Sequence, residues 1–202
     1  GYENEKEKYS DFTEKLEASF SEPSVVLNPL SELEKHQDEY IYFRTGNSWT
    51  MRGAFYGAQV IFGELGYDKE NLDAYREYVF GNFKGNLLLE ALGKYTTDEI
   101  KKGIENMEEE PFYIYINGSN PNREELTFEN KEGQLQTLKR QTIQFNGSGN
   151  YAVIGSSYKH SIVEGRGKGQ RKGNLLLIAD TRGKMMISYL SEVFEKVYVS
   201  NI

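Results

Sequence analysis

Two segments far apart in the chain share one pattern, and that pattern restricts the fold more than any other feature. Each segment has an apolar, strand-like run, then a short polar turn, then a helix-forming stretch. The first is Tyr42–Phe55, and the second is Gly173–Leu190, which a further strand-like run, Val193–Ser200, follows. Apolar runs that alternate with amphipathic helices are typical of a sheet with helices packed on it. The sequence therefore predicts an α/β fold.

Hydrophobic spacing along the rest of the chain supports this class. The segments with a helical period are 3–20, 32–38, 52–65 and much of 70–110. The predicted strands outside the middle of the chain are 24–28, 40–44 and 174–179. Short strand-like runs separated by glycine-containing turns predict an antiparallel β insertion over 111–154. The acidic run Glu108–Glu110 is expected to be a solvated end.

The composition predicts one folded domain, residues 1–202. Hydrophobic residues make up 38% of the 202 residues, which suits a chain with one substantial core. The net charge of −7 gives no electrostatic support for binding nucleic acid, so we expect none. The chain has no cysteine, which excludes disulfides and a cysteine nucleophile, and we expect no metal or other cofactor. No apolar run reaches the roughly 20 residues that cross a bilayer, so we expect no membrane span.

The turn in the first segment resembles that of a known family. Residues 42–55 read Tyr-Phe-Arg-Thr-Gly-Asn-Ser-Trp-Thr-Met-Arg-Gly-Ala-Phe. This block resembles the DHHW family, a branch of the SGNH-type hydrolases related to the alginate acetylation proteins, in which a strand ends in Asp-His-His-Trp-Thr before a Gly-Ala helix. Here Gly46, Asn47 and Ser48 stand at the Asp-His-His positions, and Trp49 and Thr50 are retained. The residues that flank the motif are therefore retained, whereas its carboxylate and its two imidazoles are missing.

The second segment is similar to the same family at the turn after its strand. Family members place Asp-Ser at this turn, with the serine as nucleophile, and a helix that reads roughly Pro-Tyr-Leu follows. The matching residues here are Asp180 and Thr181, and Tyr189 and Leu190 follow in the predicted helix. The two blocks also occur in the order that the family shows.

The resemblance implies an SGNH-like domain with a small, mainly parallel sheet flanked by helices. It also implies a crevice at the carboxyl ends of strands 40–44 and 174–179. We therefore expect Gly46–Trp49 to face Asp180–Arg182. The family further implies an exported bacterial protein, extracellular or in the cell envelope, that acts on acyl groups of glycans. The start at Gly1 rather than methionine agrees with a removed leader.

The residues at the family's catalytic positions do not supply its chemistry. Acyl transfer by a hydroxyl nucleophile needs an imidazole to take the proton and a carboxylate to orient that imidazole. Ser48 replaces the catalytic histidine and Gly46 replaces the aspartate, and neither is a base at neutral pH. Thr181 keeps a hydroxyl, but its extra methyl group restricts the rotamer and crowds the path of attack. Asp180 is expected mainly to cap the following helix.

Other residues near these turns are candidates for ligand contacts. Trp49, the only tryptophan, can brace the loop or stack on a sugar, and packing is the simpler interpretation. Asn47 and Arg182 belong to the same predicted crevice. Of the two histidines, His36 lies on a charged helix and is expected at the surface, whereas His160 is a candidate to reach the vestigial site.

Three functions remain open from the sequence. The first is a non-catalytic domain that binds a cell-envelope carbohydrate or protein partner. The second is a divergent glycan O-acetyl esterase or O-acetyltransferase that uses Thr181 with Asp180 and His160. The third is a purely structural accessory domain. An enzyme must place a base within about 3 Å of Thr181, whereas a binding module needs exposed aromatic side chains around a pocket.

Overall fold

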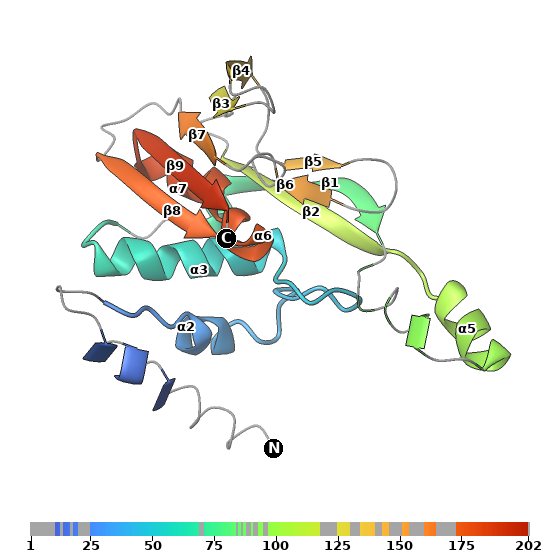
Figure 1. The fold of residues 1–202 in the computed structure, drawn as a ribbon. Helices are drawn as coiled ribbons and strands as arrows, with labels where there is room; N and C mark the ends of the chain where they lie inside the picture. Colours follow the sequence, from blue (N-terminus) through green and yellow to red (C-terminus); the bar gives the residue numbers. More distant parts are fainter. Residues whose placement is uncertain are drawn as a thin grey trace.

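A computed structural model shows the arrangement of the chain (Figure 1). The structure describes residues 11–12, 14–16, 18–19, 25–68, 71–83, 85, 87, 90, 93–94, 97–117, 125–129, 134–139, 143–145, 151–153, 160–164 and 173–201. The named helices are α2 (Leu30–Glu34), α3 (Met51–Glu64), α5 (Asp98–Glu105), α6 (Thr181–Lys184) and α7 (Ile187–Val193), with a 3-10 turn at Leu72–Ala74. The described residues between 11 and 19 are also helical, in agreement with part of the helix predicted over 3–20, and residues 3–10 lie outside the described chain.

Within the described residues, the strands form three small sheets. The strands are β1 (Tyr75–Phe83), β2 (Glu110–Asn117), β3 (Glu125–Glu129), β4 (Leu135–Lys139), β5 (Ile143–Phe145), β6 (Tyr151–Val153), β7 (His160–Glu164), β8 (Asn174–Ala179) and β9 (Lys196–Asn201). Strands β1 and β2 pair with each other, as do β5 and β6, and the largest sheet has the order β4-β3-β7-β9-β8. The mixed α/β class is therefore confirmed.

The prediction of a mainly parallel sheet is wrong. Of the pairs described, only β8 and β9 run parallel, and every other pair is antiparallel. Parallel neighbours need a crossover connection, and here the helices α6 and α7 supply one between β8 and β9. Strands β3 and β4, which fall in the predicted insertion, belong to this same sheet and extend it by antiparallel pairing.

Three further predictions from local pattern are also corrected. Residues 75–83, expected within a mainly helical stretch, form strand β1, because β2 pairs with both ends of it, with one irregularity between Val79 and Gly81. Residues 40–44 do not join a sheet, since their only strand-like feature is one bridge between Tyr42 and Trp49. Residues 25–28 are irregular instead of a buried strand, and Val25 is 62% exposed.

Helix α3 is the central element of the packing. It begins and ends within one residue of the predicted helix, and Gly66, with a φ of +68°, turns the chain away after it. Figure 1 shows α3 between α2 and the sheet, and it contacts α2, β2 and α7. Its Phe55 ring packs edge-on against Tyr189 of α7. Helix α7 in turn lies on β7 and β9, so the core joins both segments with which the sequence pattern began.

The other face of β8 and β9 carries exposed apolar side chains. Leu176 is 64% exposed, Ile178 is 59% exposed and Tyr198 is 37% exposed.

In the part of the chain that the structure describes, no helix has the length and apolar character needed to cross a membrane.

Candidate functional site

The structure brings the two motif segments into direct contact. The indole N–H of Trp49 donates a hydrogen bond to the backbone oxygen of Arg182, at 2.9 Å. The Ser48 hydroxyl is buried and donates to the Met185 sulfur at 3.5 Å. The predicted approach of Gly46–Trp49 to the turn that begins at Asp180 is therefore confirmed by the geometry. Trp49 serves here as a brace, because its indole N–H is bound to the opposite segment.

A third contact between the segments lies in the core. The Tyr189 hydroxyl donates to the backbone oxygen of Met51 at 2.9 Å, and the Tyr189 side chain is fully buried. Burial raises the pKa of Tyr189 well above its ordinary value, so this hydroxyl remains a donor at neutral pH. The contact links helix α7 to the first turn of α3, directly after the Trp-Thr pair.

We expect Tyr189→Phe to lower the free energy of unfolding by about 1 kcal/mol, because it removes a buried hydrogen bond without removing the ring. Urea denaturation at neutral pH measures this change. Tyr198→Phe is the matched control, since Tyr198 on β9 is 37% exposed, and we expect it to change stability little. Equal effects of the two substitutions would show that the Tyr189–Met51 bond does not join the segments energetically.

The first turn is held in shape by backbone hydrogen bonds across it. The Phe43 N–H donates to the Ser48 oxygen at 3.1 Å, and the Thr50 N–H donates to the Ile41 oxygen at 2.8 Å. The Thr50 hydroxyl donates to the Tyr40 oxygen and accepts from the Gly53 N–H, so Thr50 caps α3. Residues 41–50 therefore form a closed loop that leads directly into α3.

A buried carboxylate fastens the tip of this loop. Glu110, the first residue of β2, accepts the backbone N–H groups of Arg44 and Thr45 at 2.8 Å each, and the Tyr40 hydroxyl at 2.5 Å. The Thr45 hydroxyl also donates to Glu110 and accepts the Gly85 N–H at 2.8 Å. Glu110 is only 6% exposed, so the expectation that Glu108–Glu110 is a solvated end is wrong for this residue.

The hydrogen bonds set the charge state of Glu110. Burial by itself raises the pKa of this carboxyl, but the bonds donated by Thr45, Tyr40 and the Arg44 amide outweigh burial and hold the pKa below its ordinary value. Glu110 is thus an ionised anchor for the loop. No pattern in the sequence indicates this role, because the partners of Glu110 lie 65 to 70 positions away in the chain.

The second turn is built by a helix cap, as predicted. The Asp180 carboxylate accepts the backbone N–H groups of Arg182 and Gly183 at 3.0 Å each, and Thr181 is the first residue of α6. A Cβ on Gly183 would lie 2.7 Å from the Ala179 Cβ, so the turn also depends on a glycine at this position. Lys184, at the end of α6, is fully buried, which lowers its pKa although Asp180 acts in the opposite direction.

The remaining predicted contact residues are less closely grouped. Asn47 and Arg182 are exposed beside the joined turns. His160 begins β7 and pairs with Ser200 of β9, which in turn pairs with Ile178 of β8. Since neighbouring strands lie about 4.8 Å apart, the His160 backbone is about 10 Å from that of Ile178, at the sheet edge where β8 ends. The structure therefore places His160 two strands away from the Asp180 turn.

His36 lies in a polar network rather than at an open surface. Its ring stacks on Tyr56 with centroids 3.6 Å apart, and its Nδ1 lies 2.7 Å from a Glu39 oxygen. Arg52 bridges Glu39 and Glu77, at 3.1 and 3.2 Å. This network joins the turn after α2 to α3 and β1. Among the described residues, no group of three or more histidine and carboxylate side chains is arranged to hold a metal ion.

Comparison with known sequences identifies the family. The sequence model described as DHHW protein matches residues 27–200. The chain belongs to the DHHW family. No curated protein matches this DHHW chain.

Solved structures show the same fold as this DHHW chain. A DHHW family protein from Eubacterium siraeum matches with a TM-score of 0.67 and 20% sequence identity, over 87% of this chain and 55% of that protein. Bacillus cereus PatB1, solved with a sulfonyl adduct, matches with a TM-score of 0.53 and 15% identity, over 83% of this chain and 53% of PatB1. The DHHW chain thus spans little more than half the length of these structures.

Proposed function

We propose that this DHHW domain is non-catalytic and binds a carbohydrate or a protein partner of a bacterial cell envelope, outside the cytoplasm. The resemblance of its two turns to an SGNH-type site, with degenerate residues, supports the proposal. Its fold is similar to that of PatB1, a structure that carries a sulfonyl adduct. The two turns are held together by the contacts of Trp49 and Tyr189. The aspartate and histidine that would perform acyl chemistry in the motif are replaced by Gly46 and Ser48.

The observation that carries the proposal is the environment of Ser48. This residue stands where the motif has its catalytic histidine, and its hydroxyl points to the Met185 sulfur inside the protein. A buried hydroxyl facing a thioether cannot take a proton from Thr181, because a neutral hydroxyl is not a base at neutral pH. Gly46, at the aspartate position, has no side chain to orient a base.

We expect Thr181→Ala to leave the release of acetate from p-nitrophenyl acetate and from acetylated xylan at the same background rate as in the wild-type protein. Thr97→Ala is the matched control, since Thr97 likewise lies at the N-terminus of a helix and its side chain makes no capping hydrogen bond. Acetate release that Thr181→Ala abolishes and Thr97→Ala preserves would overturn the non-catalytic proposal.

A second candidate is a divergent O-acetyl esterase or O-acetyltransferase that uses Thr181, and the burial of Lys184 favours it. Lys184 follows Thr181 by three residues in α6, and its lowered pKa increases the fraction of neutral amine that can accept a proton. This candidate requires that Lys184→Met abolish acetate release as completely as Thr181→Ala does. It places the base on α6, in contrast to the earlier expectation for His160.

A further inference from the structure

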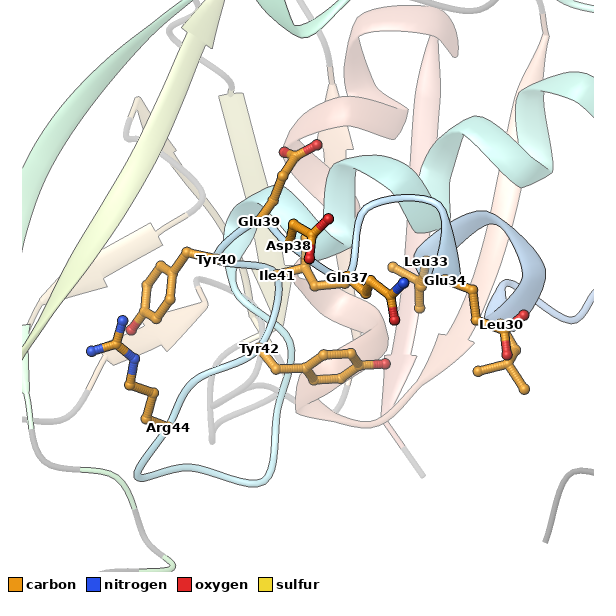
Figure 2. A pocket seen from close by; sticks show the side chains of 10 residues that line it. All are labelled: Leu30, Leu33, Glu34, Gln37, Asp38, Glu39, Tyr40, Ile41, Tyr42 and Arg44. Atoms are coloured by element: carbon orange, nitrogen blue, oxygen red, sulfur yellow. The ribbon is translucent and has the colours of Figure 1, made fainter. Parts of the chain in front are cut away.

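An open pocket lies beside the first motif loop, separate from the joined turns. It has a volume of about 470 Å³ and is formed by α2, the turn after it and the loop that begins at Glu39 (Figure 2). The residues that matter for recognition are Leu30, Glu34, Gln37, Asp38, Tyr42 and Arg44. The pocket is large enough for a sugar ring, and polar and apolar side chains both line it.

Tyr42 gives the pocket an aromatic wall. Its neighbours in the chain, Ile41 and Phe43, are 5% exposed, whereas Tyr42 is 51% exposed, as alternation along an extended segment requires. The bridge between Tyr42 and Trp49 fixes the backbone at this point. Figure 2 shows the Tyr42 ring turned toward α2, next to Gln37. A half-exposed ring on a fixed backbone can stack on the apolar face of a pyranose at low entropic cost.

The charges around the pocket are mostly negative. Two carboxylates, those of Glu34 and Asp38, line the pocket together with the guanidinium of Arg44, while the carboxylate of Glu39 at its edge is paired with Arg52. Figure 2 shows Arg44 beside Tyr40, on the other side of the view from Leu30 and Glu34, and its guanidinium carbon lies 5.6 Å from the centre of the Tyr40 ring. The side of the pocket that Tyr42 and α2 form is therefore acidic, in a chain whose net charge is −7.

The exposed Tyr42 ring and the carboxylates together determine which ligands the pocket can bind. Carboxylates accept hydrogen bonds from sugar hydroxyls and attract a protonated amine, and they repel the carboxylate of a uronic acid. We propose that the pocket binds a pyranose with a protonated amino group, such as a glucosamine unit of a glycan, with its ring on Tyr42 and its amine toward Asp38 and Glu34. This assignment rests on the proposed binding function and gives it a site and a ligand class.

The test compares three tetrasaccharides by isothermal titration calorimetry at low salt and about pH 6, where a sugar amine is protonated and the carboxylates are ionised. The probes are the tetramers of glucosamine, N-acetylglucosamine and galacturonic acid. We expect the glucosamine tetramer to bind about tenfold more tightly than the N-acetylated one, with no binding of the galacturonate. Added salt is expected to weaken the binding of the amine form.

Substitutions assign the binding to the pocket. We expect Tyr42→Ala to weaken the binding of the glucosamine tetramer about tenfold, since it removes the stacking surface. Asp38→Asn is expected to reduce the preference for the amine over the acetamide about threefold, while keeping the overall shape. The controls are Tyr78→Ala, a 45% exposed tyrosine on β1, and Asp68→Asn, an exposed aspartate after α3, and neither should change binding.

Each contrary outcome has a definite meaning. Binding that Tyr42→Ala leaves unchanged, a preference for galacturonate, or no binding of any tetramer overturns the proposed site and ligand class. Loss of affinity in Asp68→Asn as large as in Asp38→Asn also overturns it, because attraction would then follow net charge alone. None of these results bears on whether the domain is catalytic, which is tested separately through the Thr181→Ala variant.

Discussion

The substitution Gly53→Ala is expected to lower the free energy of unfolding by about 3 kcal/mol or to prevent stable folding. A Cβ at this position would lie 2.3 Å from the Ile41 carbonyl oxygen and 2.8 Å from the Trp49 Cβ. The Ile41 oxygen cannot move away easily, because it accepts the Thr50 N–H at 2.8 Å. The close approach of α3 to the motif loop therefore requires glycine, and chemical denaturation measures the loss.

Gly103→Ala provides the control for this effect. Gly103 lies in helix α5, and a Cβ there would meet no atom within 4 Å. Because alanine favours the helix over glycine, we expect this substitution to stabilise the protein by roughly 0.5 to 1 kcal/mol. The same change in two helices should thus have opposite signs. A loss of stability in Gly103→Ala equal to that in Gly53→Ala would contradict the steric explanation.

The second large effect is expected for Glu110→Gln. The carboxylate accepts bonds from two backbone amides and from the hydroxyls of Tyr40 and Thr45, and the amide of glutamine would turn a donor toward some of these donors. We expect a loss of about 2 to 3 kcal/mol at pH 7, measured by urea denaturation. The substitution should also displace the loop tip that contains Arg44 and Thr45.

The difference in stability between wild type and Glu110→Gln should depend on pH. The pKa of Glu110 is lowered in the folded protein, so its contribution is fully present above the ordinary carboxyl pKa and disappears as the pH falls through the lowered value. The difference in stability between wild type and Glu110→Gln should therefore shrink in acid. Glu109→Gln is the control, because Glu109 is exposed and should show almost no difference at either pH. A difference for Glu110→Gln that stays constant from neutral to acid pH would contradict the role of its charge.

Local patterns predicted the parts of the fold that local interactions determine. Helix α3 and strand β8 have strong apolar periods, and both were predicted nearly to the residue. The contact of the Trp49 loop with the Arg182 turn followed from the resemblance to a family motif. Strand β1 was missed because its aromatic residues fit either a helix or a strand until β2, far along the chain, pairs with it.

The residues that hold the first motif loop in place could not be predicted from local patterns. Glu110 and Gly85 contact Thr45 only after folding, and no spacing in the sequence indicates these contacts. A Cβ on Gly85 would lie 2.2 Å from the Thr45 carbonyl group, which explains the glycine only once the structure is known. Tyr42 was likewise predicted as part of the strand 40–44, whereas its side chain lines a pocket.

The non-catalytic proposal is tested most directly by the intact mass of the protein after incubation with an aryl sulfonyl fluoride. PatB1 has been solved with a sulfonyl adduct, so a structurally similar protein accepts such a group. We expect the incubation to add the same mass, or none, to the wild type and to Thr181→Ala, with no adduct that depends on Thr181. A single adduct that maps to Thr181 in the wild type and is missing from Thr181→Ala would contradict the proposal and show an activated nucleophile.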